Sequence, residues 1–383
     1  MNELSTCNLQ HLNQIAHKLL TWFRQNARDL PWRRTRDSYA IWVSEIMLQQ
    51  TQVKTVLPYW KRWMQALPTI QALAKASPQK IHKLWEGLGY YIRVRNMQRA
   101  AQIVVKEHNG EFPREFEAVL ALPGIGRYTA GAVCSIAFNQ PTPILDGNVI
   151  RVLTRLFGIE GDPREKKTNA KLWRIAEDLV KSVGRTSPRA VNGVAVSNER
   201  RLAGTFAPPP LVTCSHFNQS LMELGALICT PKNPRCSDCP IKTSCVAHRK
   251  RIVHLLPNVS RRASATSRRF LAFVIERNSR FLVRQRPAGV VNAHLWEFPN
   301  LEINGETDIH KIAETALGFR PESLQLTRTI KHTITRYRIT LDVFRVVANG
   351  NGSLAESDYR WLRPKQLRGL PFTSAHKKIL TEL

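Results

Sequence analysis

Acidic residues and long apolar runs are what this sequence lacks. Only 29 Asp and Glu oppose 57 Lys and Arg in 383 residues, which leaves a formal charge of +28. No apolar run approaches the roughly 20 residues that span a bilayer, and the start, MNELSTCNLQHL, has neither the basic nor the apolar region of a signal peptide. We therefore expect no membrane association, a bacterial-type cytoplasmic and nucleoid location, and a polyanionic partner such as nucleic acid.

Cysteine is scarce as well, and most of it is clustered. Of the seven cysteines, three are isolated and four lie close together, at Cys229, Cys236, Cys239 and Cys245. In a reducing compartment such a group predicts a metal site rather than a disulfide framework.

Helical periodicity runs through the first part of the chain. Apolar residues recur every three or four positions between residues 9 and 23, and similar patterns, separated by short loops with Pro or Gly, continue to about residue 183. Residues 184–215 lack periodicity and include the sequence APPP, which predicts a long flexible loop. We expect an all-α domain over residues 1–250.

The character of the chain changes after a basic linker at residues 251–268. Residues 270–276, 280–284 and 333–347 are rich in β-branched and aromatic residues, and residues 308–317 can form a helix. Residues 269–383 are therefore expected to form a separate α+β domain.

Residues 122–130 read LPGIGRYTA, a glycine-rich turn directly before an apolar helix. Because Gly124 and Gly126 have no side chains, backbone N–H groups there can approach a phosphate, beside the positive charge of Arg127. This is a helix-hairpin-helix signature, and it predicts binding to the DNA backbone. The alternative is a hairpin with a purely structural role.

Asp146 follows the short apolar run PIL and precedes a helical segment. An acid at such a place is either an ordinary N-cap or a functional carboxylate. The local sequence alone does not separate these two interpretations.

The order of these features, a glycine-rich hairpin, then an aspartate, then four cysteines, resembles the endonuclease III superfamily of base-excision glycosylases. In that superfamily the spacing Cys229-x6-Cys236-x2-Cys239-x5-Cys245 holds a 4Fe-4S cluster, with one thiolate per iron. Zinc is the alternative, although zinc sites usually use two close cysteine pairs. The resemblance implies an all-α helix-hairpin-helix glycosylase domain with a cluster loop at residues 229–245.

Two further segments, NARDLPWR at 26–33 and IWVSEIMLQQTQV at 41–53, resemble the MutY-type adenine DNA glycosylases, and the likeness covers most of residues 10–250. Glu45 lies among apolar neighbours that should raise the pKa of its carboxyl and keep it protonated. The resemblance implies that Glu45 protonates adenine, while an ionised Asp146 stabilises the positive charge developing on the sugar. The alternative for Glu45 is a buried carboxyl satisfied by a backbone or Arg partner.

The resemblance also assigns residues around this pair. Tyr128 and Asn148 would hydrogen-bond the two carboxylates and help to position water. Bifunctional relatives have a lysine where this chain has Tyr128, so base removal without an efficient lyase step is expected. Arg28, Leu30, Trp32, Gln219 and Glu223 would line the adenine pocket, and Leu48, Gln50 and Tyr90 would enter or flank the gap in the duplex. Core packing is the alternative for Trp32 and Tyr90.

Residues 269–383 resemble the Nudix-like domain with which such glycosylases inspect the base opposite adenine, through LWEFP at 295–299 and GET at 305–307. The following segment, KIAETALG, lacks the paired glutamates that hold magnesium in a hydrolase, so recognition rather than hydrolysis is expected. Thr335 and Arg336 stand in place of the family's Phe-Ser-His loop. Their hydroxyl and guanidinium groups are expected to hydrogen-bond the lesion.

These features predict a monomeric repair enzyme that flips adenine, paired with 8-oxoguanine or guanine, out of double-stranded DNA and hydrolyses its N-glycosidic bond. A sliding clamp is a partner by analogy with the family. Two alternatives remain, a glycosylase for another mismatch such as thymine opposite guanine, and a DNA-binding protein without catalytic activity. Glu45 disfavours a thymine glycosylase because thymine has no equivalent basic ring nitrogen to protonate.

Overall fold

The computed structural model describes residues 9–186, 213–260, 264–303, 305, 308–334, 336–347, 359–381 and 383. The chain forms two compact units, one from residues 1–53 and 103–260 and the other from residues 54–102 and 261–383. Most of the predicted loop at residues 184–215, and Thr335, lie outside the described residues. Within the described part, no helix has the length and apolar character needed to cross a membrane.

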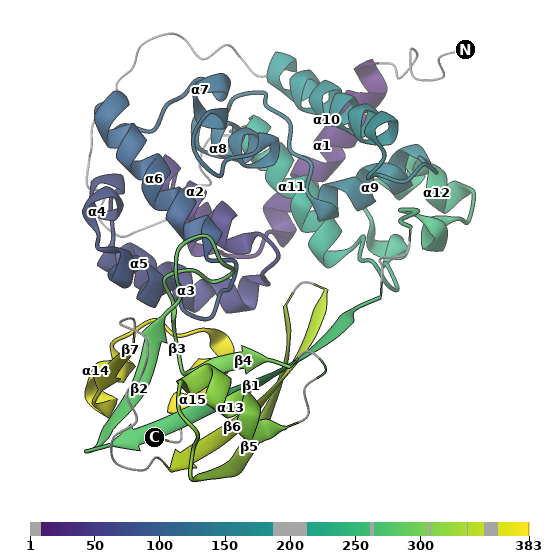
Figure 1. Ribbon diagram of the computed structural model, residues 1–383. Helices are drawn as coiled ribbons and strands as arrows, with labels where there is room; N and C mark the ends of the chain where they lie inside the picture. Colours follow the sequence, from purple (N-terminus) through teal and green to yellow (C-terminus); the bar gives the residue numbers. More distant parts are fainter. Residues whose placement is uncertain are drawn as a thin grey trace. The chain divides into compact units, whose positions relative to one another are not determined.

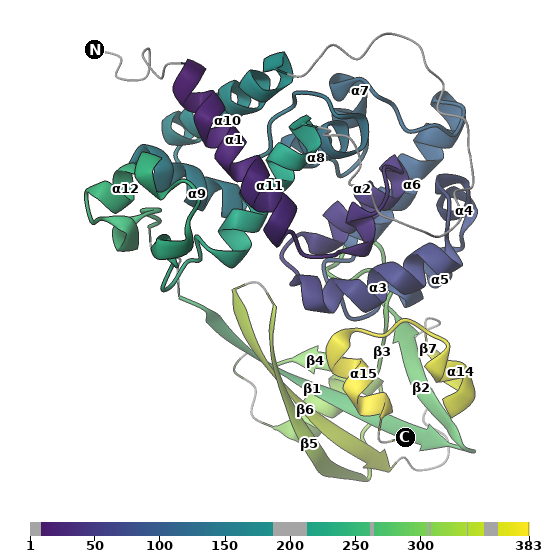
Figure 2. The same ribbon diagram turned by 180° about the vertical axis from the view of Figure 1, so that it is seen from behind.

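The first unit is helical, as the sequence predicts (Figures 1 and 2). The periodic residues near the start form α1, which buries Leu12, Ile15 and Leu19. The α-helices of this unit are α1 (Leu9–Asn26), α2 (Ser38–Leu48), α7 (Phe116–Leu120), α8 (Arg127–Phe138), α9 (Gly147–Phe157), α10 (Lys166–Thr186), α11 (Thr213–Leu227) and α12 (Val246–Arg249), and its 3-10 helices are η1 (Pro31–Arg33), η2 (Cys236–Asp238), η3 (Lys242–Ser244) and η4 (Val253–Leu255).

Helix α11 is the centre of this unit and packs against α1, α8, α9 and α10. Its apolar residues, including Phe217, Leu221 and Leu224, are almost completely buried in the core that these helices share. Because α8 and α9 both contact α11, their first turns are held on a rigid support. These two first turns follow the predicted hairpin and Asp146.

The second unit joins the helices α3 (Val53–Ala66), α4 (Ile70–Lys75) and α5 (Pro78–Trp85), with part of α6 (Ile92–Glu107), to the C-terminal sheet. Glu86, just after α5, accepts hydrogen bonds from the backbone N–H of Phe372 at 2.9 Å and from Lys377 Nζ at 2.6 Å. The two compact units are groups of residues in contact, and they are not by themselves independently folding domains. The predicted boundaries at residues 250 and 269 therefore stay a prediction.

The C-terminal part is a mixed sheet with helices, in agreement with the predicted α+β class. Along the sheet the strands run β3-β2-β1-β6-β5, with β4 beside β1 and β7 beside β2, and the long central pair β1 and β6 is parallel. The strands are β1 (Thr266–Arg277), β2 (Arg280–Gln285), β3 (Trp296–Glu297), β4 (Asn300–Glu302), β5 (Ser323–Ile334), β6 (Tyr337–Val347) and β7 (Tyr359–Leu362), and the helices are α13 (Ile309–Leu317), α14 (Pro364–Arg368) and α15 (Ser374–Leu380).

The segment 333–347, rich in strand-forming residues, is divided between two strands. It contains the turn of an antiparallel hairpin in which Ile334 pairs with Tyr337. Most of β5 was not foreseen, because this edge strand is largely exposed and Ile330 is its only buried residue among those described. The helix expected at 308–317 is confirmed as α13, with Asp308 as its N-cap.

Candidate active site

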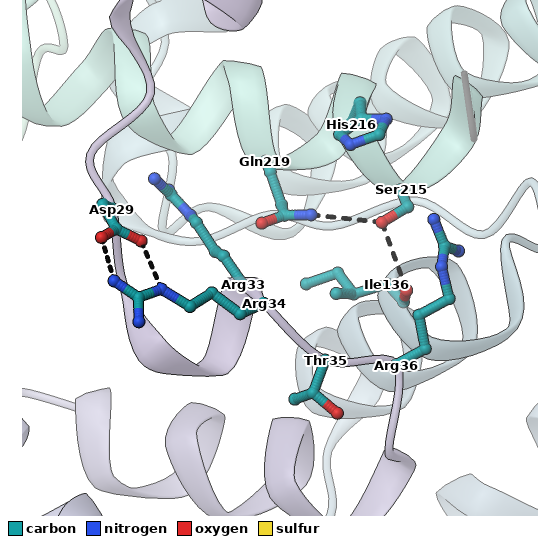
Figure 3. A pocket seen from close by; sticks show the side chains of 9 residues that line it. All are labelled: Asp29, Arg33, Arg34, Thr35, Arg36, Ile136, Ser215, His216 and Gln219. Atoms are coloured by element: carbon teal, nitrogen blue, oxygen red, sulfur yellow. Dashed lines mark hydrogen bonds and ion pairs between the residues drawn. The ribbon is translucent and has the colours of Figure 1, made fainter. Parts of the chain in front are cut away.

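A cavity lined mostly by polar and charged residues lies beside η1 and the first turns of α11 (Figure 3). Its lining residues are Asp29, Arg33, Arg34, Thr35, Arg36, Ile136, Ser215, His216 and Gln219. Gln219 Nε2 donates a 3.1 Å hydrogen bond to the Ser215 hydroxyl. Neither Glu45 nor Asp146 lines this cavity. The assignment of Gln219 to an adenine pocket therefore stays a prediction.

Glu223 is fully buried on α11, with 0% of its surface exposed, and is bound by two arginines. Arg28 donates to it through its backbone N–H at 2.9 Å, Nε at 2.8 Å and Nη2 at 2.7 Å, and Arg33 through Nη2 at 2.8 Å. Burial alone would raise the pKa of this carboxyl, but the hydrogen bonds from Arg28 and Arg33 lower it to about 2. The ionised Glu223 thus ties the segment around η1 to α11.

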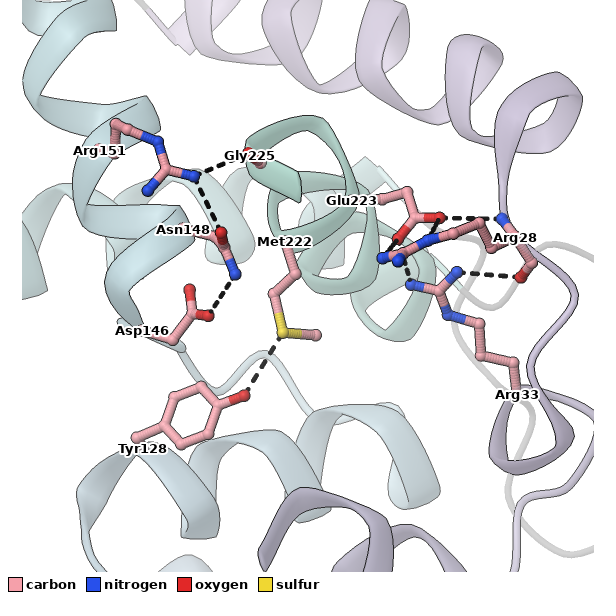
Figure 4. Close-up of polar contacts among 9 residues, drawn as sticks. All are labelled: Arg28, Arg33, Tyr128, Asp146, Asn148, Arg151, Met222, Glu223 and Gly225. Carbon is pink, nitrogen blue, oxygen red and sulfur yellow. Dashed lines mark hydrogen bonds and ion pairs between the residues drawn. The ribbon is translucent and has the colours of Figure 1, made fainter. Parts of the chain in front are cut away.

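Met222 and Glu223 are neighbours on α11 but point to different sides (Figure 4). Glu223 faces the two arginines, whereas the Met222 sulfur lies 3.4 Å from the hydroxyl of Tyr128 on α8. Burial raises the pKa of Tyr128 well above its ordinary value, and the charges of Glu45 and Asp146 raise it further. The hydroxyl therefore stays protonated and acts as a hydrogen-bond donor.

Glu45 lies on α2 and is 4% exposed. Its Oε2 accepts a 2.6 Å hydrogen bond from the Tyr128 hydroxyl. Burial raises the pKa of Glu45 to about 7, although the Tyr128 bond and the positive charge of Arg33 oppose the rise. A carboxyl with this pKa is protonated in a large fraction of molecules at neutral pH, as a general acid requires.

Asp146 caps the N-terminus of α9. Its Oδ1 accepts the backbone N–H of Val149 at 2.7 Å, and its other oxygen accepts Nδ2 of Asn148 at 2.9 Å. The N-cap interpretation is thus correct, and it does not exclude a catalytic role. Burial raises the pKa of Asp146 above its ordinary value and the hydrogen bonds from Val149 and Asn148 limit the rise, so the predicted ionised state depends on them.

The two carboxyl groups share one site. Tyr128 is hydrogen-bonded to Glu45, and the charge of Asp146 raises the pKa of both groups. Asn148 lies on the other side of Asp146. The structure therefore brings together the four residues predicted as catalytic.

Arg151, one turn after Asn148 on α9, connects this site to the cysteine loop. Its Nη2 donates to Oδ1 of Asn148 at 2.9 Å and to the carbonyl of Gly225 at 2.7 Å, and its Nε donates to the carbonyl of Cys229 at 2.6 Å. Because Arg151 occupies the amide oxygen of Asn148, the amide nitrogen is turned toward Asp146. Figure 4 shows Arg151 with Asn148, Asp146 and Gly225.

The four clustered cysteines line a single cavity, together with Arg155, Ile228, Pro234, Lys242, His248 and Val253. None of the four forms a disulfide within the described residues. Arg155 Nη1 lies 3.3 Å from Cys229 Sγ and also donates to the carbonyl of Thr230 at 2.8 Å. A buried guanidinium beside the sulfurs suits a site that carries the negative charge of thiolates. Among the described residues, no three metal-ligating side chains form a group suited to one metal ion.

Four residues assigned to DNA or base contact lie between residues 30 and 50, in or next to η1 and α2. Leu30 and Trp32 are both 5% exposed, so in the free protein they belong to the core. Leu48 is half-buried and Gln50 is exposed. Gln50 has a φ of 55°, a left-handed conformation that is uncommon for a residue with a side chain and is concentrated at functional positions. These contact roles stay predictions.

Two further predicted residues belong to the second unit. Tyr90 is 41% exposed, which contradicts the core-packing alternative for this residue, and its φ is 48°. Arg336 lies at the turn between β5 and β6, where its Nη2 donates to the hydroxyl of Tyr337 at 3.0 Å.

The glycine-rich turn precedes α8 as predicted. Gly124 has a φ of 76°, which a residue with a side chain rarely adopts. Gly126 differs, because its φ of −97° is ordinary and a side chain there would meet nothing within 4 Å. No internal packing thus requires glycine at position 126, which favours close approach of an outside group over a purely structural hairpin.

Sequence reasoning missed Arg33, Arg151, Arg155 and Met222. The two arginines of α9 are 8% and 2% exposed, although arginine is mostly a surface residue. A signal was present, since Arg151 and Arg155 interrupt the apolar residues that α9 buries against the core. Nothing in the sequence shows that the carbonyl groups of residues 225, 229 and 230 would be their partners.

Two family models match the chain. Residues 43–178 match the HhH-GPD superfamily of base excision DNA repair proteins, and residues 271–382 match the NUDIX domain. The solved structure of a thermostable thymine-DNA glycosylase is 28% identical, with a TM-score of 0.51 over 63% of this chain and 98% of that one. The helical and Nudix-like parts of the predicted fold are thus confirmed.

Full-length relatives define the family more closely. The chain is 35% identical to the adenine DNA glycosylase of Rattus norvegicus, over 97% of this chain and 78% of that protein. It is 34% identical to the adenine DNA glycosylase of Homo sapiens, over 94% of this chain and 72% of that protein. The protein belongs to the adenine DNA glycosylases, base-excision repair hydrolases that act on N-glycosidic bonds.

Proposed function

We propose that this glycosylase removes adenine paired with 8-oxoguanine, or with guanine, without cleaving the DNA strand efficiently. The observation that carries the catalytic part is the buried carboxyl of Glu45, whose pKa is raised to about 7 and which accepts a hydrogen bond from Tyr128. Adenine is a poor leaving group as an anion, so a ring nitrogen must be protonated before the bond to the sugar breaks. Glu45 is the acid that holds this proton.

Asp146 acts on the sugar. As the glycosidic bond breaks, positive charge develops at the sugar carbon, and an ionised carboxylate nearby stabilises it or bonds to it transiently. The hydrogen bonds from Val149 and Asn148 hold this carboxylate in one orientation and favour its ionised form. Water then adds to the sugar carbon, and the deoxyribose retains its phosphodiester bonds.

The absence of strand cleavage is proposed from Tyr128. A lyase step needs an unprotonated amine that attacks the sugar carbon and forms a Schiff base. Tyr128 offers a hydroxyl with a pKa far above neutrality, and it is already engaged with Glu45. It positions the acid and does not act as a nucleophile.

The four cysteines are proposed to hold a 4Fe-4S cluster. Their spacing and their arrangement around one cavity fit four thiolates with one iron each, and Arg155 is placed to offset their charge. When bound, such a cluster ties residues 229–245 together without needing to change its redox state. Arg151 and Asn148 connect this loop to Asp146 by hydrogen bonds.

The Nudix-like part is proposed to inspect the base opposite adenine. In α13 the described residues include only one acid, Glu314, where hydrolysis would require paired magnesium ligands. Arg336 presents a guanidinium at the β5–β6 turn, which supports base or phosphate contact. A sliding clamp remains a partner by family analogy alone.

A panel of duplexes tests the proposal. Wild-type protein is incubated with adenine opposite 8-oxoguanine, adenine opposite guanine, and thymine opposite guanine, and free base and strand breaks are measured separately. The expected result is free adenine from the first two duplexes, with strand breaks only after alkali. Thymine release from the third duplex would favour the mismatch specificity of the thymine-DNA glycosylase, and strand breaks without alkali would disprove the monofunctional assignment.

A further inference from the structure

Arg127 is the first residue of α8 and follows Gly126 at the hairpin turn. Its side chain is exposed, and its guanidinium forms no hydrogen bond or ion pair with any residue in the described part of the chain. The group instead lies over the ring of Trp173, with its central carbon 4.1 Å from the ring centroid. A guanidinium has five N–H donors, and contact with a ring face does not pair them with an acceptor, so they stay open to an outside one.

A cation at this position is unfavourable for the helix itself. The N-terminus of a helix carries partial positive charge, which acidic side chains stabilise and basic side chains destabilise. The first turn of α8 contains no acidic residue, and Gly126 provides no side-chain cap. Both the unpaired cation and the uncapped N–H groups are therefore suited to an external anion.

Trp173 belongs to a different element. It lies on α10, is half-buried, and packs against the core of the first unit. Its ring is thus fixed by the core, while its free face supports the guanidinium of Arg127. Cation–π attraction of this kind orients a charged group without neutralising it, whereas an acidic partner would cancel its charge.

We propose that Trp173 is a positioning residue for DNA binding, which holds Arg127 in the orientation that contacts a backbone phosphate beside the hairpin. The inference deepens the predicted role of Arg127 and rests on the DNA-backbone function of the hairpin. It extends that function to α10, which the sequence did not connect with DNA.

The salt dependence of binding tests this inference. Each phosphate contact contributes about 0.9 to the slope of log affinity against log salt concentration. Trp173→Leu keeps an apolar side chain but removes the aromatic face. We expect it to weaken binding to uncleaved duplex about three- to tenfold and to lower the slope by about 1, as Arg127→Ala does. The double variant should add nothing, because both changes remove the same contact.

Two controls separate positioning from packing. Phe138→Leu removes a ring that carries Arg114 at 5.3 Å on the same helix α8, away from the hairpin turn, and should leave the slope unchanged. Trp173→Phe keeps an aromatic face and should restore most of the affinity. If Trp173→Leu lowers the thermal midpoint strongly, Trp173→Phe carries the test instead, because it should keep the slope of wild type while Arg127→Ala lowers the slope by about 1.

Two results would overturn the inference: a wild-type slope in Trp173→Leu, or losses in Trp173→Leu and Arg127→Ala that add up in the double variant. The assay needs no base excision, so it remains readable if the proposed substrate is wrong.

Discussion

The hydroxyl of Tyr128 donates a 2.6 Å hydrogen bond to Glu45, and this bond opposes the effect of burial on the glutamate. Burial raises the pKa of Glu45 to about 7, and the hydrogen bond favours the charged form and limits the rise. One residue of α8 thus adjusts the acid presented by α2. The pKa of Glu45 thereby stays close to the pH at which the residue must donate its proton.

The first prediction concerns the pH profile of excision. The rate measured at saturating enzyme should fall as pH rises through about 7, because Glu45 loses the proton that it must donate. Tyr128→Phe removes the bond that lowers the pKa of Glu45, so the pKa rises and the falling limb should move to higher pH. A falling limb that stays in place, or moves to lower pH, would show that the Tyr128 hydrogen bond does not set the pKa of Glu45.

The second prediction concerns Arg151. Arg151→Met removes the donor that turns Asn148 toward Asp146, so the excision rate at saturating enzyme should fall about tenfold or more, while DNA affinity stays within about twofold. The free energy of unfolding should also fall by about 3 kcal/mol, because buried carbonyl groups at residues 225 and 229 lose their partner.

A surface arginine provides the control for this change. Arg164 lies in the same unit, is half-exposed and pairs with Asp162. Arg164→Met breaks this pair and should leave excision unchanged. If Arg151→Met excises at the wild-type rate, Arg151 stabilises the fold without orienting the site.

The third prediction concerns Gly225 on α11. A Cβ there would lie 2.6 Å from Cβ of Asn148 and 3.0 Å from its backbone, so Gly225→Ala must push the first turn of α9 away. We expect a loss of about 1–3 kcal/mol in unfolding free energy and a reduced excision rate. Gly369→Ala is the matched control, since its Cβ would make only an ordinary 3.4 Å contact. Equal activity of both variants would show that the Asn148 backbone can shift without consequence.

The fourth prediction concerns stability in acid. Because the pKa of Glu223 is lowered to about 2 from 4.5, its bonds with Arg28 and Arg33 contribute stability above the unfolded pKa. The contribution is about 3 kcal/mol and should be lost as pH falls from 4.5 toward 2. In denaturant titrations, the difference in unfolding free energy between wild type and Glu223→Gln should become smaller as pH falls over this range. Asp29→Asn, in the exposed pair with Arg34, should show no comparable gap. A gap for Glu223→Gln that does not change with pH would mean that its charge is not the cause.

Much of the site could be predicted because the chemistry leaves a local pattern. The apolar neighbours of Glu45 indicated a raised pKa, and the position of Asp146 before a helix indicated both an N-cap and a functional acid. The pairing of Tyr128 with Glu45 came from family resemblance, since these residues are far apart in the chain and no periodicity connects them.

The rest depended on tertiary contacts. Arginine is usually a surface residue, so the sequence does not indicate that Arg151 is buried. Only the packing of α9 against α11 shows that Arg151 links Asn148 to Cys229. Residue propensity did not show the turn at Arg336, which only the family resemblance placed in a loop, because β-branched residues occur on both sides of it and the edge strand β5 is mostly exposed. Propensity identifies residues that suit a strand, but it does not show where a hairpin turns.

The central claim is that a protonated Glu45 releases adenine while Asp146 stabilises the sugar cation. Its most direct test is the excision rate at saturating enzyme for wild type, Glu45→Gln and Asp146→Asn, on adenine opposite 8-oxoguanine, with folding checked by thermal midpoint. The account predicts a loss of about 100-fold or more for each variant, with DNA binding retained. Excision by Glu45→Gln at the wild-type rate would contradict it.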